Sequence, residues 1–133
     1  MLAGQRPRSL GLADGRLASC GRRLNCVSSQ ADPADAQRYV APIPFRGTTA
    51  EAMAAARRAV ESMPRVAVVR QDANYLHVEF ASKWLGFVDD VEFTYDESAG
   101  LLHLRSASRL GRRDFNVNRK RVEALRAAIG ANR

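Results

Sequence analysis

The feature that most constrains the fold is an alternation of apolar and polar residues that runs through three segments between Tyr75 and Arg109. A period of two is typical of β-strands that bury only one of their faces. A short apolar run, Val66–Gln71, precedes them, and turn-forming residues separate all four segments. We therefore expect four strands that form an antiparallel meander.

Two predicted helices flank these strands. Thr48 and Glu51 match a capping box, and apolar residues then recur at helical spacing until Pro64 ends the pattern. A second helical pattern covers residues 117–129, with Asn116 as its expected N-cap. The sequence thus predicts an α+β fold, in which a four-stranded antiparallel meander sheet carries two helices, one before and one after it, packed on one face.

Residues 1–46 contain scattered Gly and Pro and follow neither periodicity, so we expect an extended N-terminal arm beside a single α+β domain of residues 47–133. The arm holds the chain's two cysteines, Cys20 and Cys26. An oxidising compartment would allow them to form a disulfide that closes a short loop, whereas a reducing one would keep them free.

The chain has no apolar run long enough to span a membrane, and its first residues lack the apolar stretch of a signal peptide. We expect a soluble, cytoplasmic protein, or an envelope or periplasmic one if a leader was removed. The net charge of +7 is unevenly placed, because residues 105–133 carry nine basic and two acidic side chains. Such a tail attracts phosphate-bearing partners, but its only aromatic residue is Phe115, which argues against binding of nucleic acid by base stacking.

Strand alternation gathers ionisable residues on one face of the predicted sheet. A tight hairpin around Trp84-Leu85 would place Glu79 opposite Asp90 and His77 opposite Glu92. The full band is His77, Glu79, Asp90, Glu92, His103 and Arg105. We favour a solvated face held by salt bridges, with a ligand-binding or catalytic face as the alternative.

Asp89 departs from the pattern, because alternation places its carboxylate on the apolar face. A buried carboxylate requires a partner. We expect that partner to be Arg109, Arg112, Arg119 or the backbone donors near Asn116, although a β-bulge at Asp89-Asp90 would also resolve the conflict.

The connection from the last strand to the last helix is dense in hydrogen-bonding groups. A polar loop before a helix N-terminus favours anions, and the competing interpretation is a structural network that locks the helix to the sheet. The candidate binding residues of this region are Ser106, Ser108, Arg109, Asp114, Asn116, Asn118 and Arg119, which we consider together with Asp89, Asp90, Glu92 and Arg105.

Standard signatures of catalysis or cofactor binding do not occur in the sequence. It contains no G-x-S-x-G, no phosphate-binding loop and no dinucleotide fingerprint. Two cysteines and two distant histidines do not have zinc-ligand spacing. We therefore expect no cofactor and no metal, and we assign no catalytic residue.

Several runs resemble the family of uncharacterised proteins called domain of unknown function fourteen-ninety-nine. They are Asn25–Ser29, Phe87–Phe93 and Arg105–Arg126, and the resemblance extends from about Leu10 to Ile129. The chain departs from it at residues 21–24, where the family typically has prolines. The resemblance implies a family of bacteria, often with an envelope-directed leader, and of plant plastids, without an established activity, substrate or cofactor.

Three functions remain open from the sequence. The first is a non-catalytic binding or interaction module that holds a small anion or an acidic headgroup at its Arg/Asn/Ser cluster. The second is a hydrolase-like enzyme that uses Asp89, Asp90 or Glu92 with Arg105 or Arg109. The third, and the least favoured, is nucleic-acid binding through the basic C-terminal helix. The sequence decides neither between enzyme and binding module nor the oligomeric state.

Overall fold

A computed structural model of the chain describes residues 5–83, 86–111 and 116–131. The elements follow one another in the order β1 (Cys26–Ser28), β2 (Ile43–Pro44), α1 (Thr49–Glu61), β3 (Val66–Asp72), β4 (Tyr75–Ala81), β5 (Val88–Asp96), β6 (Leu101–Ser108) and α2 (Val117–Ala131).

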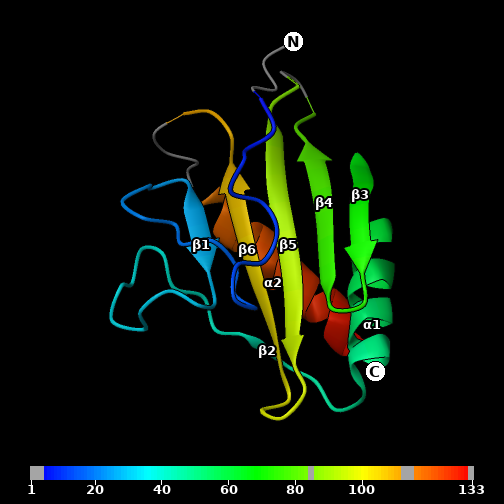
Figure 1. The fold of residues 1–133 in the computed structure, drawn as a ribbon. Coiled ribbons are helices and arrows are strands. Elements are labelled where there is room, and N and C mark those ends of the chain that lie inside the picture. The colour runs from blue at the N-terminus through cyan, green and yellow to red at the C-terminus, as the bar shows by residue number, and fades with distance from the viewer. Residues whose placement is uncertain (1–4, 84–85, 112–115, 132–133) are drawn as a thin grey trace.

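All strands lie in one antiparallel sheet of order β1-β6-β5-β4-β3, and β2 also pairs with β6 (Figure 1). The predicted register is confirmed, with Glu79 opposite Asp90 and His77 opposite Glu92. Pairing continues without a shift through Asp89 and Asp90, so the predicted alternative of a β-bulge there is wrong. Trp84-Leu85, expected at the tip of the β4–β5 hairpin, lies outside the described residues.

The sheet has six strands, and the prediction of four is wrong. Strands β1 and β2 both pair with β6, which would otherwise present a row of unpaired backbone groups at the edge of the meander. They contain three and two residues, too few for any periodicity to appear in the sequence. Their place depends on the edge that they cover rather than on local preference.

Both helices pack on the same face of the sheet, as predicted (Figure 1). Helix α1 begins with the expected capping box between Thr48 and Glu51. Helix α2 follows Asn116, whose backbone has a φ of 65° and whose carbonyl accepts the first helical bond, from the Lys120 amide. The apolar stripe of α2 is fully buried and consists of Val122, Leu125 and Ile129.

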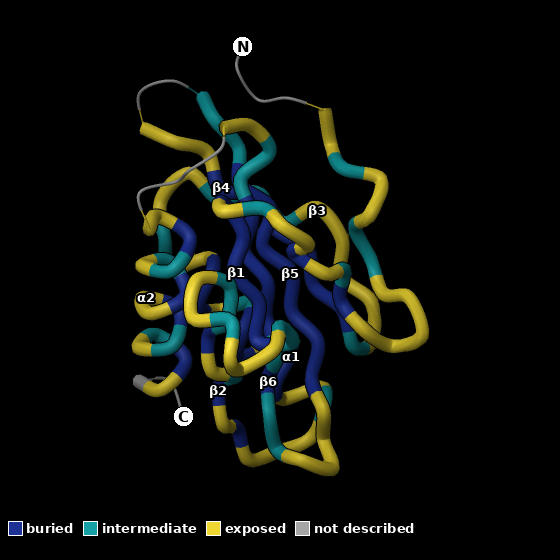
Figure 2. The backbone as a smooth tube through the Cα atoms, turned by 90° about the vertical axis from the view of Figure 1, so that its left-hand side faces the viewer, coloured by how far each residue is buried: buried dark blue, intermediate teal, exposed yellow. Residues whose placement is uncertain are grey.

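The expectation of an extended N-terminal arm is not confirmed. Leu17, Val40, Ile43 and Phe45 are buried, and Ile43 and Phe45 belong to the same core as the helices and the sheet (Figure 2). Residues 5–17 cross the face of the sheet that the helices leave open, in front of β5 and β6 in Figure 1. We call this the outer face, and the helix-covered one the inner face.

Candidate functional site

The outer face carries a cluster of charged and polar side chains, which we call the outer cluster: Tyr75, His77, Glu79, Asp90, Glu92, Arg105 and Arg109. The interpretation as a solvated face is wrong. Glu92 is 0% exposed, Asp90 1%, and His77 and Arg105 3% each. The strands alternate as expected, but residues 5–17 shield this face from water. The predicted salt bridges are therefore present, whereas the predicted exposure to solvent is not.

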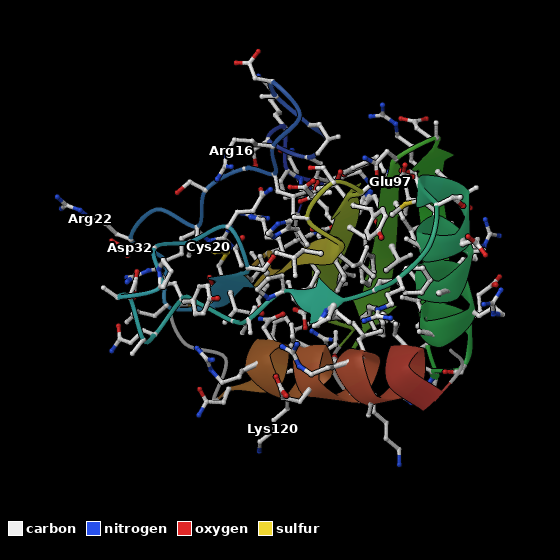
Figure 3. The ribbon with its side chains drawn as sticks, turned by 90° about the horizontal axis from the view of Figure 1, so that it is seen from below. Arg16, Cys20, Arg22, Asp32, Glu97 and Lys120 are labelled. Carbon is white, nitrogen blue, oxygen red and sulfur yellow. A yellow bond between two sulfur atoms is a disulfide. The ribbon has the colours of Figure 1, made fainter. Side chains whose placement is uncertain are left out.

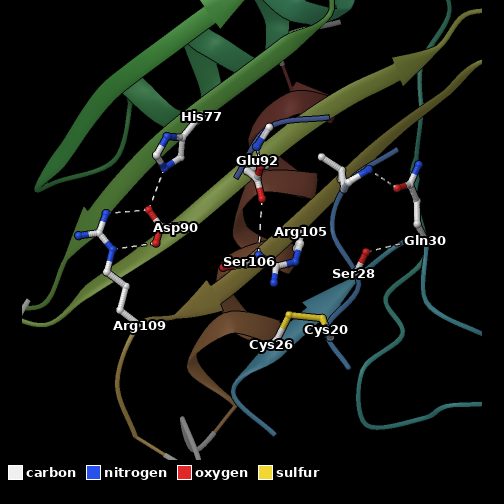
Figure 4. A network of polar contacts seen from close by, with 12 residues as sticks. Cys20, Cys26, Ser28, Gln30, His77, Asp90, Glu92, Arg105, Ser106 and Arg109 are labelled. Carbon is white, nitrogen blue, oxygen red and sulfur yellow. Dashed lines mark hydrogen bonds and ion pairs between the residues drawn. A yellow bond between two sulfur atoms is a disulfide. The ribbon is translucent and has the colours of Figure 1, made fainter. Parts of the chain in front are cut away.

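Asp90 is the hub of the outer cluster (Figure 4). Its Oδ1 lies 2.8 Å from His77 Nε2, and Arg109 donates from Nε to Oδ2 at 2.8 Å and from Nη2 to Oδ1 at 2.9 Å. Arg109 also donates to Glu79, which in turn pairs with Arg6 at 2.8 Å. Burial alone would raise the pKa of Asp90, but the bonds from Arg109 and His77 outweigh it and hold that pKa below its ordinary value.

Glu92 and Arg105 form the second pair of the cluster, with 3.5 Å between Glu92 Oε1 and Arg105 Nη1. Glu92 Oε2 accepts from the Tyr75 hydroxyl and, at 2.9 Å, from the backbone amide of Gly11. Burial raises the pKa of Tyr75, and its bond to Glu92 adds to the rise, while burial lowers the pKa of Arg105. Among the described side chains, Glu92 Oε1 and Arg105 Nε are buried without a hydrogen bond.

Asp89 lies on the inner face, as alternation predicts, and is 9% exposed. Its partner is Arg121 of α2, at 2.8 Å, and not Arg109 or Arg119. Arg121 also stacks on the Phe80 ring, 4.8 Å from its centroid. Two of the expected partners are wrong: Arg109 follows the strand onto the outer face, and Arg119 donates to backbone carbonyls. The third, Arg112, lies outside the described residues.

The Ser/Asn cluster of the sequence forms a buried network around Asn118. Asn118 Oδ1 accepts from Ser106 Oγ at 2.5 Å, and its Nδ2 donates to Ser108 Oγ at 2.9 Å and to the Asn25 carbonyl at 3.1 Å. Arg121 also donates to Asn118 Oδ1, at 2.9 Å. The network joins the start of α2 to β6 and to the residue before β1, as a structural lock would.

Arg119 is separate from that network. It donates to the backbone carbonyls of Ala36, Gln37 and Tyr39 at 3.0 Å each, so it fastens α2 to the loop before β2. Asp114 lies outside the described residues. The predicted candidates are therefore divided between an outer group, with Asp90, Glu92, Arg105 and Arg109, and an inner group, with Asp89, Ser106, Ser108 and Asn118.

A pocket of about 580 Å³ opens beside Arg109. Residues 22–25 form one wall of the pocket, and the rest of its lining consists of Pro7, Arg109 and Gly111. Arg23 donates from Nε to Asn25 Oδ1 at 3.1 Å and from Nη2 to the Ser108 carbonyl, which fixes its guanidinium at the wall. Cys20 and Cys26 are joined by a disulfide and enclose this wall in a closed loop.

The pocket contains functional candidates that the sequence did not single out. Arg22, Arg23 and Asn25 precede the first strand in a stretch without periodicity. The one available signal was the run Asn25–Ser29, which matched the family resemblance without indicating a role for Asn25.

His77, Glu79 and Asp90 offer ligand atoms within 4.8 Å of one another, a spacing that suits a metal ion. Arg109, however, bonds to both carboxylates and supplies the positive charge that a metal would bring. This donor set therefore fits a closed ion-pair network better than a metal centre. The expectation of no metal stays a prediction.

The fold and these clusters define a small α+β protein with an antiparallel sheet, two helices on one face and a covered charged cluster on the other. The chain belongs to the family described as "Protein of unknown function (DUF1499)", whose model matches residues 16–129. No curated protein matches it. Neither helix in the described part of the chain is long and apolar enough to cross a membrane.

Proposed function

We propose that the protein is a non-catalytic binding module that holds a small phosphate-like anion in the pocket between residues 22–25 and Arg109. The observation that carries the proposal is an imbalance of charge at the pocket. Arg22 and Arg23 line it, and neither pairs with a carboxylate of the described residues. An anion would supply the missing negative charge.

The wall of the pocket is already arranged for such a ligand. Two of the guanidinium nitrogens of Arg23 are held by Asn25 and by the Ser108 carbonyl, and Nη1 donates to none of the described residues. A guanidinium that is fixed before binding loses less side-chain entropy when it meets the ligand. Charge-assisted bonds from arginine to phosphate oxygens are also among the strong ones.

The enzyme hypothesis receives less support from the same geometry. Asp89 lies on the inner face and Asp90 and Glu92 on the outer face, so the three carboxylates do not converge. Each is paired with an arginine of the chain, and none of them lines the pocket. A general acid or base needs access to a substrate, which these side chains do not have.

Nucleic-acid binding through α2 is likewise less favoured. Arg119 and Arg126 donate to backbone carbonyls of residues 36–42, and Arg121 pairs with Asp89. These cations are already engaged within the fold, which leaves few for a phosphate backbone.

Titration calorimetry with inorganic phosphate tests the proposal. Arg23→Gln should weaken binding at least about tenfold, because a hydrogen bond to a charged group contributes roughly 1.5–3 kcal/mol and 1.4 kcal/mol is a factor of ten. Arg57→Gln, which removes an equal charge from the exposed face of α1, is the matched control and should bind like the parent. No measurable heat at millimolar phosphate, or equal losses in the two variants, would refute a specific site.

A further inference from the structure

The surface around the pocket combines its charges with exposed apolar side chains. Leu24, Leu110 and Val117 are the three most exposed large apolar residues of the described chain, at 42%, 43% and 45%. We call these three residues the apolar tip.

Hydrogen bonds place the three segments of the apolar tip together. Asn25, next to Leu24, donates from Nδ2 to the carbonyls of Leu110 and Gly111. The carbonyl of Asn25 accepts from Asn118, the residue after Val117. The tip therefore gathers around Asn25, beside the pocket that we propose for the anion.

Basic side chains lie next to the residues of the apolar tip in the sequence. Arg22 and Lys120 both point away from the body of the protein, and neither forms an ion pair with a described residue (Figure 3). Lys120 is three residues after Val117 in α2, a spacing that places the two on neighbouring parts of the helix surface. Arg23 adds a third cation at the pocket wall.

From this arrangement we infer that the anion is the headgroup of an anionic lipid, and that the end of the molecule with the apolar tip docks on a membrane surface. The inference rests on the proposed function and names the source of its anion. A free phosphate ion would need the arginines alone. Apolar side chains within a basic rim also suit the boundary between headgroups and acyl chains of an anionic bilayer.

Such docking is peripheral and reversible. Three apolar side chains give shallow insertion, so attraction between the basic rim and the lipid charges supplies much of the binding. That attraction is screened by salt. Binding should therefore weaken as the salt concentration rises.

Co-sedimentation of the full chain with lipid vesicles tests the inference. The vesicles are phosphatidylcholine alone or mixed with phosphatidylglycerol. We expect binding to the mixed vesicles only, and we expect Leu110→Asn/Val117→Asn to lower the partition coefficient about tenfold while the affinity for inorganic phosphate stays that of the parent. Val69→Asn, a single substitution of the same kind on β3 at the opposite edge of the sheet, should bind vesicles normally.

The outcomes separate the two proposals. Phosphate binding without vesicle binding overturns the lipid inference and leaves the anion site standing. Absence of both overturns both. Vesicle binding that survives the double substitution overturns docking through the apolar tip, since plain electrostatic adsorption would explain it. Circular dichroism of each variant establishes that it is folded.

Discussion

The outer cluster and the pocket are both rich in arginine, but they differ in whether the arginines are paired with carboxylates. In the outer cluster, the side chains of Arg105 and Arg109 are only 4% and 7% exposed and are paired with carboxylates. At the pocket, Arg22 and Arg23 have no carboxylate partner in the described structure. Charges that are paired with carboxylates hold the fold together, whereas charges without a carboxylate partner are available to a ligand. The predictions below test that division.

The largest expected effect is the loss of the hub of the outer cluster. Asp90→Ala leaves Arg109 without its buried counter-charge and His77 without its hydrogen-bond partner, and breaking a buried pair in this way costs about 3–5 kcal/mol. Urea denaturation measures the free energy of unfolding. Asp72→Ala removes an exposed partner of Arg70 and should cost less than about 1 kcal/mol, so similar losses in the two variants would contradict a special role for burial.

The disulfide links stability to the pocket. Replacing both Cys20 and Cys26 by Ser should lower the free energy of unfolding by about 2 kcal/mol, because the bond closes only a short loop. The same change should weaken phosphate binding, since the loop carries Arg23 and Asn25. Calorimetry together with urea denaturation measures both. Unchanged phosphate affinity in the double variant would show that the loop does not position the site.

The outer cluster should also make stability depend on pH. The pKa values of Asp90 and Glu79 are below their ordinary 3.8 and 4.5 in the folded protein. Their contribution to stability is therefore fully present above these ordinary values and is lost as the pH falls through the lower, folded ones. Denaturation followed between pH 6 and pH 3 should show a decline below about pH 4 that is reduced in Arg109→Gln. A decline of equal size in that variant would assign the effect to other carboxylates.

The smallest stability effect is expected at the pocket. Arg22 is exposed and pairs with no carboxylate of the described residues, so Arg22→Gln should change the free energy of unfolding by less than about 0.5 kcal/mol. Phosphate affinity should nevertheless fall several-fold if the cation faces the ligand. If Arg22→Gln lowers stability but keeps phosphate affinity, Arg22 has a structural role and does not bind the ligand.

Strand register was predictable because a period of two fixes which residues face each other. His77 and Glu92, or Glu79 and Asp90, could be paired from the sequence alone once the hairpin was assumed. The capping box of α1 was visible for a similar reason, since Thr48 and Glu51 interact within one turn. Local chemistry is sufficient in both cases.

The cover of the outer face was not predictable in that way. Gly11, Arg6 and the short strands β1 and β2 have no periodicity, and their positions follow from partners far along the chain. The partner of Asp89 was missed because the choice between Arg119 and Arg121 depends on how α2 is turned against the sheet. Contacts between residues far apart in the sequence, rather than local preference, determine these features. The same contacts form the pocket.

The bond between the Gly11 amide and Glu92 has a consequence for synthesis. These residues are 81 positions apart, and the N-terminal one leaves the ribosome first. Residues 5–17 must therefore wait, without the surface that they cover, until β5 and β6 have been made. The outer face therefore cannot be covered before β6 has been synthesised, so the N-terminal segment lacks its partner surface during most of synthesis.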